Sequence, residues 1–149
     1  MNPLSLIATV LQKGYHPRAM DDAGFRRTRA REAVLRLLEK SGRPLSHQEI
    51  QKGLKEGACD RVTIYRALET LHSAGLLHRI QGSDGLWRFC AHRSTAGACP
   101  SNHIHFLCQG CGKMSCLPEQ PLPWIQAPKG AAILSKQLVV HGLCAACAR

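Results

Sequence analysis

The chain has 149 residues, which is enough for one domain of ordinary size or for two small ones. Its 20 Lys and Arg outnumber its 10 Asp and Glu, and the formal charge of +10 favours a polyanionic partner. No run approaches the roughly eighteen apolar residues of a membrane span, and the opening residues lack the pattern of a signal peptide, so we expect a cytoplasmic protein.

A first amphipathic helix is predicted from Thr28 to about Gly42, after an N-terminal extension, residues 1–24, to which we assign no function. Residues 26–36 contain five Arg, so the outer face of this helix should be strongly basic. The apolar residues that recur with helical spacing are Ala30, Ala33, Val34, Leu37 and Leu38.

A second helix should begin after Ser46, because Ser46 and Glu49 form the S-x-x-E pattern of a capping box. Leu45 and Ile50 occupy the hydrophobic-staple positions on either side of this pattern. The sequence therefore defines the start of this helix closely.

A third helix should begin after Asp60, a residue type that caps helices well, and end at Gly75, a typical residue just beyond a helix. Tyr65 and Arg66 lie outside its apolar stripe and should face away from the core. The stripe itself consists of Ile64, Ala67, Leu68 and Leu71.

Two β-prone runs follow, residues 76–80 and 86–91, and the sequence QGSDG between them is typical of a hairpin turn. Three helices and a hairpin predict a winged helix-turn-helix over residues 25–91. Residues 92–102 are small, polar and turn-rich, and we expect them to be a hinge.

A second domain is expected over residues 103–149. HIHFLC and KMSCL are strand-like, the proline-rich stretch 118–130 excludes a long helix, and residues 131–140 are strand-like again. The predicted fold is thus α+β, with a winged helix-turn-helix followed by a small α/β domain that zinc stabilises.

Four cysteines form two C-x-x-C pairs, Cys108 with Cys111 and Cys144 with Cys147. Each pair can direct two thiolates to one point, and two pairs complete the tetrahedral sulfur shell of a structural zinc site. The alternative, a pair of thioredoxin-like redox motifs, lacks the βαβ context that such motifs need.

A second zinc site is predicted from histidines and cysteines that do not belong to the two C-x-x-C pairs. His103 and His105 lie two apart on one strand, so both imidazoles should lie on the same face. His78 and Cys90 lie on the two hairpin strands, and Cys116 follows the first cysteine pair. Three imidazoles and one thiolate would favour zinc over iron or manganese because of their softness.

The order of these motifs resembles the Fur family of metal-dependent bacterial repressors. The matching segments extend over about residues 25–148, and they are Arg26 to Thr28, LSHQEI, TIYRALETLHSAGLL, HIHFLCQGCGK and HGLCAAC. The resemblance implies that the winged helix binds double-stranded operator DNA, that the second domain forms a homodimer, and that bound metal sets their relative orientation.

Within this family the chain is most similar to the zinc uptake regulators. The segment HGLCAAC is similar to that branch, Cys90 stands where iron and peroxide sensors typically have a carboxylate, and Pro44 stands where iron-type members often have a histidine. The resemblance implies a zinc-responsive repressor of zinc uptake genes with two zinc sites per subunit. The proline-rich stretch 118–128 departs from the family, which usually has a longer helix there.

The resemblance also implies a role for individual residues. The four cysteines of the two C-x-x-C pairs hold the structural zinc. The sensory zinc is held by His78, Cys90, His103 and His105, with Cys116 as the reserve ligand if His105 does not reach the metal. On the third helix, Tyr65 and Arg66 reach base edges and Thr63 belongs to the same DNA-binding motif. The phosphate contacts fall to Arg27, Arg29 and Arg61.

Three other functions stay open at this point. An iron- or peroxide-sensing member of the same family is the main alternative, and a non-specific zinc-containing nucleic-acid-binding protein is a weaker one. A zinc hydrolase is disfavoured because the sequence has no H-E-x-x-H or paired-carboxylate motif. We therefore expect neither an enzyme nor a small-molecule substrate.

Overall fold

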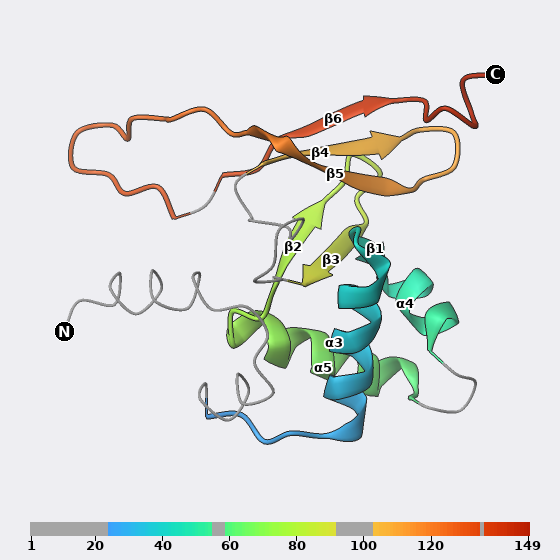
Figure 1. Ribbon diagram of the computed structural model, residues 1–149. Coiled ribbons are helices and arrows are strands. Elements are labelled where there is room, and N and C mark those ends of the chain that lie inside the picture. The colour runs from blue at the N-terminus through green and yellow to red at the C-terminus, as the bar shows by residue number, and fades with distance from the viewer. Residues whose placement is uncertain (1–23, 55–58, 92–102, 135) are drawn as a thin grey trace.

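The computed structural model describes residues 24–54, 59–91, 103–134 and 136–149. Three helices lie beneath a small sheet, and a second sheet lies above it (Figure 1). The helices are α3 (Arg29–Ser41), α4 (His47–Gly53) and α5 (Arg61–Ser73). The described residues are therefore arranged as a helical layer, a wing sheet and an upper sheet.

The first predicted helix is confirmed as α3. Thr28 caps it by accepting a hydrogen bond from the backbone N–H of Arg31, and Gly42 ends it with a φ of 63°, a conformation that glycine adopts without strain. Leu35 is buried, whereas the predicted core residue Leu37 is only half-buried. The face that packs inward is therefore shifted from the one that the apolar spacing suggested.

The second and third helices also begin where the sequence predicted. Ser46 and Glu49 form both hydrogen bonds of a capping box at the start of α4. Asp60 accepts a hydrogen bond of 2.8 Å from the backbone N–H of Thr63 at the start of α5. The inward stripe of α5 is buried as predicted: Ile64, Ala67, Leu68 and Leu71.

The wing sheet contains β1 (Leu45–Ser46), β2 (Leu77–Gln81) and β3 (Trp87–Ala91), paired antiparallel in the order β1-β3-β2. Leu77, Phe89 and Ala91 pack on the helices in one apolar core. The predicted winged helix-turn-helix is thus confirmed, and the opposite face of the wing is left to contact the upper sheet.

The upper sheet contains β4 (His103–Cys108), β5 (Met114–Pro121) and β6 (Val139–Gly142), in the order β5-β4-β6. β4 pairs antiparallel with β5 and parallel with β6. The described part of residues 103–149 contains no helix, although a small α/β domain was expected there. The α+β class of the whole chain is confirmed.

The strand expected over residues 131–140 is wrong for most of its length. Residues 131–134 and 136–138 form no strand, and pairing with β4 begins only at Val139. Residues 131–134 belong to a long loop that extends beyond both sheets, so they have no strand to pair with (Figure 1). Gln137 and Leu138 return to the sheets, and Leu138 accepts a hydrogen bond from the N–H of His105 just before the pairing begins.

A second apolar cluster joins the two sheets. Ile80 and Cys90 of the wing pack with Leu107 and Met114 of the upper sheet. The predicted hinge, residues 92–102, and nearly all of the N-terminal extension lie outside the described residues. Among the helices that are described, none has both the length and the apolar character needed to cross a membrane.

Candidate metal centres and DNA-binding face

The first cysteine pair spans the end of β4 and the tight turn that follows it. The backbone N–H of Gly112 donates to the carbonyl of Cys108 at 2.9 Å, and Gly112 has a φ of 71°. That left-handed conformation favours glycine, and it lets the turn close around Cys111. The turn therefore directs the thiols of Cys108 and Cys111 to the same side.

The second pair closes a similar turn, in which the N–H of Cys147 donates to the carbonyl of Cys144 at 2.9 Å. The four Sγ atoms of the two pairs all lie within 4.8 Å of one another. A Cβ added to Gly110 would lie 2.9 Å from Cys147 Cβ, so this glycine allows the two turns to approach. Sequence reasoning missed Gly110, although its place inside the C-x-x-C turn was visible.

The electrostatics of this four-sulfur cluster suit a cation. The N–H of Cys144 donates to Cys108 Sγ at 3.3 Å and, with the N–H of Cys111, lowers the pKa of the Cys108 thiol to about 6. The pKa of Cys147 is raised to about 12, chiefly because its thiol forms a hydrogen bond with the side chain of Cys144. Several thiolates can coexist at such short range only with a positive charge among them, and a divalent metal provides it.

A second cluster lies on the face of the upper sheet that is turned toward the wing. Ligand atoms of His103, His105 and Cys116 lie within 4.8 Å of one another. Cys116 is the register partner of His105 across the β4–β5 pair, so both side chains share a face. The reserve ligand is thus brought into this cluster together with His105, rather than in place of it.

The imidazole of His105 fits a metal ligand better than a structural core residue. Its side chain is 3% exposed, and neither of its ring nitrogens has a hydrogen-bond partner. A buried polar atom without a partner destabilises a fold by about 1–3 kcal/mol, whereas a metal bond would satisfy one nitrogen. We take this orphaned imidazole as the clearest sign of a metal site among the described residues.

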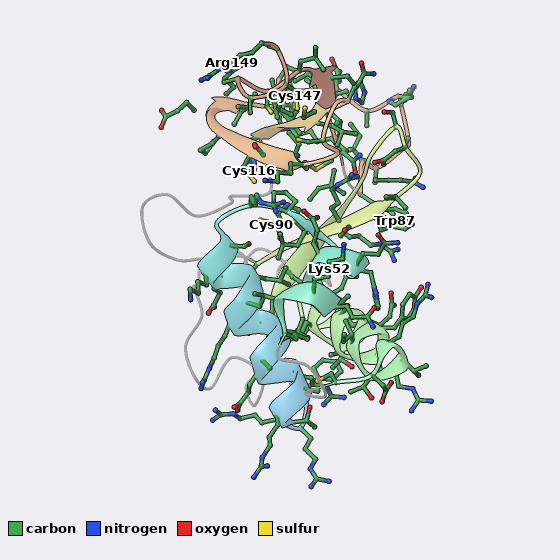
Figure 2. The ribbon with its side chains drawn as sticks, turned by 90° about the vertical axis from the view of Figure 1, so that its right-hand side faces the viewer. Lys52, Trp87, Cys90, Cys116, Cys147 and Arg149 are labelled. Atoms are coloured by element: carbon green, nitrogen blue, oxygen red, sulfur yellow. The ribbon has the colours of Figure 1, made fainter. Side chains whose placement is uncertain are left out.

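His78 and Cys90 face this cluster from the wing, but they are not members of the 4.8 Å group. The ring centroid of His78 lies 5.8 Å from that of His105 and 6.4 Å from that of His103. Cys90 is buried in the apolar cluster against which Cys116 packs. Figure 2 shows Cys90 and Cys116 on either side of the boundary between the two sheets, with Cys147 farther away.

The candidate base-reading residues lie on the outer face of α5. Tyr65 is 60% exposed and Arg66 is also exposed, as expected for side chains that reach into a groove of DNA. Thr63 is different, because its hydroxyl donates to Asp60 Oδ2 at 2.8 Å and is engaged in the helix cap. The exposed face of α5 can therefore present an aromatic ring and a guanidinium together.

The candidate phosphate contacts lie at the starts of α3 and α5. Arg29 and Arg61 are exposed at the first positions of these helices. Arg27 forms an ion pair of 2.7 Å with Glu32. His47 was not singled out by sequence reasoning, yet its ring centroid lies 6.2 Å from that of Tyr65; its position directly after the Ser46 cap was the available signal.

Comparison with known proteins agrees on one family. Residues 22–138 match the model of the ferric uptake regulator family. The chain is 25% identical over 138 residues to the ferric uptake regulation protein of Synechococcus elongatus, a match that covers 87% of this chain and 90% of that protein. The ferric uptake regulation protein of Bacillus subtilis is 28% identical over 135 residues, with 86% and 89% covered.

Solved structures share the fold. The ferric uptake regulator of Vibrio cholerae has a TM-score of 0.62 at 20% identity, covering 85% of this chain and 98% of that one. A zinc uptake regulator complexed with zinc and DNA has a TM-score of 0.59 at 22% identity, covering 99% and 96%.

Regulators of this family respond to metals, bind operator DNA as dimers and are not enzymes. The family match covers most of the chain, and residues 103–149 carry two clusters of side chains that could hold a metal. The chain therefore belongs to the ferric uptake regulator family and is a metal-responsive transcriptional regulator.

Proposed function

We propose that this regulator is a zinc-responsive repressor, which binds operator DNA as a homodimer when loaded with zinc and controls zinc uptake genes. The observation that carries this proposal is the composition of the cluster at the sheet boundary. His103, His105 and Cys116 offer nitrogen and sulfur atoms, and the nearby wing residues His78 and Cys90 add the same two types. Soft thiolates combined with imidazoles favour zinc, whereas iron and manganese sensors rely more on oxygen ligands.

The four cysteines are proposed to hold a separate, structural zinc. Cys108 ends β4 and Cys111 lies in the turn after it, and Cys144 and Cys147 follow β6, so a shared ion would fasten the ends of two paired strands. All seven described cysteines are free thiols, which suits the reducing cytoplasm in which we place the protein. Zinc would supply a tetrahedral cross-link there and no redox chemistry.

The sensory response is proposed to arise from the position of its ligands on two units. His78 and Cys90 belong to the wing, whereas His103, His105 and Cys116 belong to the upper sheet. Such ligands meet only when the two sheets lie face to face, so metal binding favours that arrangement over any other. We propose residues 25–91 as the DNA-binding unit, 92–102 as the hinge and 103–149 as the dimerisation unit.

The second unit offers an apolar surface for a second copy of the chain. Trp124 and Leu134 lie on the long loop between β5 and β6, and each is 90% exposed. The exposed large apolar side chains of this unit are Trp124, Ile125, Ile133, Leu134, Leu138, Val140 and Leu143. A monomer rarely exposes so many in one region, and burial between two copies would remove them from water.

An iron-responsive regulator is the second candidate, because both curated relatives are ferric uptake regulation proteins. The two candidates differ in which metal promotes DNA binding. The test begins with selection of duplexes from a random-sequence DNA library by the zinc-loaded protein. Affinity for the selected duplex is then measured without oxygen at buffered zinc, ferrous iron and manganese.

We expect zinc to promote binding at far lower free concentration than either other metal. Cys90→Ser and Cys116→Ser then identify the thiolate that matters, with Cys59→Ser as a matched control from the helical core. The critical variant should keep its structural zinc but lose the zinc response. Binding promoted by ferrous iron alone, or unchanged zinc responses in both cysteine variants, would contradict the proposed sensory site.

A further inference from the structure

The turn of the wing is fastened to the upper sheet at a place distinct from both metal clusters. The side chain of Gln137 donates to the carbonyl of Gln81 at 2.8 Å and accepts from its N–H at 3.3 Å, as a neighbouring strand would. Ser83 Oγ lies 3.3 Å from His141 Nδ1. The hairpin turn therefore contacts segments of the second unit that lie far along the chain.

Arg88 is the buried centre of this contact. Its side chain is 2% exposed, and its guanidinium donates to both carboxylate oxygens of Asp84, at 3.0 and 2.7 Å. Nη2 also donates to the carbonyl of Gly112 at 2.8 Å. The pair with Asp84 stays within the wing, whereas the bond to Gly112 crosses to the second unit.

The two residues that this bond joins both lie next to residues of the proposed function. Gly112 directly follows Cys111 in the first cysteine turn, and Arg88 lies two residues before Cys90 on β3. Arg88 is also the register partner of Ser46, the cap of α4, across the β1–β3 pair. The bond to Gly112 thus joins the first cysteine turn to β3, and β3 pairs with the short strand that precedes α4.

We propose that Arg88 is a positioning residue that docks the wing on the first cysteine turn. This inference rests on the proposed zinc and DNA binding and adds a second connection between the units. The docked turn holds the wing in its DNA-competent place, and the wing in turn holds the carbonyl of Gly112. By linkage, loss of the bond should weaken DNA binding and also loosen the four-cysteine site.

The guanidinium suits this role better than another cation would. Its planar fork binds the Asp84 carboxylate with two parallel bonds and still has a donor for Gly112. An ammonium is a single point charge without that geometry, so Arg88→Lys should restore only part of the docking. Arg88→Met should fold, because it fills the buried space with apolar atoms while Asp84 remains partly exposed to water.

The first readout is amide hydrogen exchange of the zinc-loaded protein. The N–H of Gln81 bonds across to Gln137, whereas the N–H of Ile64 bonds to the Asp60 carbonyl at the start of α5, away from Arg88. We expect Arg88→Met to raise exchange at Gln81 by about tenfold, as loss of a charge-assisted bond implies, and to leave Ile64 and the rest of α5 near wild type. Arg36→Met is the control, because it removes the same charge from an exposed part of α3.

The second readout is the rate of zinc release to a chromophoric chelator. It is measured in a His105→Ala background, which removes a ligand of the sensory site so that zinc is released from the four cysteines. Loss of a partner outside the ligand set weakens metal binding by about 10–100-fold, so Arg88→Met should release zinc at least about tenfold faster. A role confined to the wing would not change this rate. Arg36→Met should match the background protein.

The third readout is the affinity of zinc-loaded protein for the selected duplex, which should fall about tenfold in Arg88→Met. Gln137→Ala, from an exposed side chain, tests the same docking if Arg88→Met does not fold. It removes the acceptor of the Gln81 N–H itself, so its readout is the rate of zinc release, which should rise. Wild-type exchange and wild-type zinc release in Arg88→Met, or wild-type zinc release in Gln137→Ala where Arg88→Met does not fold, would overturn the inference. A wild-type protein without zinc, or without zinc-promoted DNA binding, would instead contradict the proposed function.

Discussion

Substitution of Gly110 by alanine tests the geometry of the four-cysteine cluster. The new methyl group would lie 2.9 Å from Cys147 Cβ and 3.0 Å from its Sγ. Carbon atoms prefer about 3.5–4.0 Å, so Cys147 must move by about 0.6–1 Å. That is several times the tolerance of about 0.2 Å for ligand distances in a metal site. Overpacking of this kind costs about 1–3 kcal/mol, which corresponds to about 5–150-fold weaker zinc binding.

The assay is competition for zinc between a chromophoric chelator and the protein in the His105→Ala background. Gly142→Ala is the matched control, because its methyl group would meet Phe106 Cε2 at 3.0 Å in the same sheet but no cysteine. We expect a loss of thermal stability in both variants and a loss of zinc affinity in Gly110→Ala alone. Equal zinc affinity in Gly110→Ala and wild type would refute the assignment of Cys147 as a closely packed ligand.

Three further predictions concern the dimer, the DNA contacts and acid stability. Leu134→Asp should produce monomers with intact zinc content, as measured by sedimentation; a stable dimer would exclude the loop from the interface. Arg66→Ala should cost about 1–3 kcal/mol on the selected duplex and little on random DNA, whereas Arg29→Ala should weaken both and reduce the salt dependence. The pKa of Asp60 is lowered from its ordinary 3.8, chiefly because its carboxylate accepts a hydrogen bond from the Thr63 N–H. The ionised Asp60 therefore stabilises the fold above pH 3.8, and this stabilisation is lost as the pH falls through the lowered pKa of the folded state. Asp60→Asn should remove that part of the acid sensitivity in urea unfolding between pH 5 and pH 3, and an unchanged profile would contradict it.

The helical unit was predictable because its signals are local. The Ser46–Glu49 box and the Asp60 cap each involve residues three apart, and both formed as expected. Leu35 was missed as a core residue of α3 because the spacing of apolar residues defines a stripe along the helix but does not show which edge of that stripe is buried most deeply. The long loop after β5 was also missed in part, since a strand-like composition does not reveal whether a partner strand is nearby.

The metal clusters were predictable to the extent that their spacing is local. The two C-x-x-C pairs and the H-x-H pair follow directly from turn geometry and strand alternation. The position of Cys116 opposite His105 depends on the register of β4 with β5, which sequence alone does not fix. The contact of Arg88 with Gly112 depends on how the two sheets pack, and no local pattern encodes it.

The parallel pairing of β4 with β6 has a consequence for the order of folding. The N–H of Cys144 donates to Cys108 Sγ although the two residues are 36 positions apart in the sequence, with β5 and the long loop between them. Closing a loop of that length costs about 4 kcal/mol of chain entropy, while β6 is only four residues long. The helical unit, whose contacts are nearer in sequence, can reach its native state first. A newly made chain can therefore complete its helical unit before its second half, and the supply of metal to the four cysteines would set how soon that half folds.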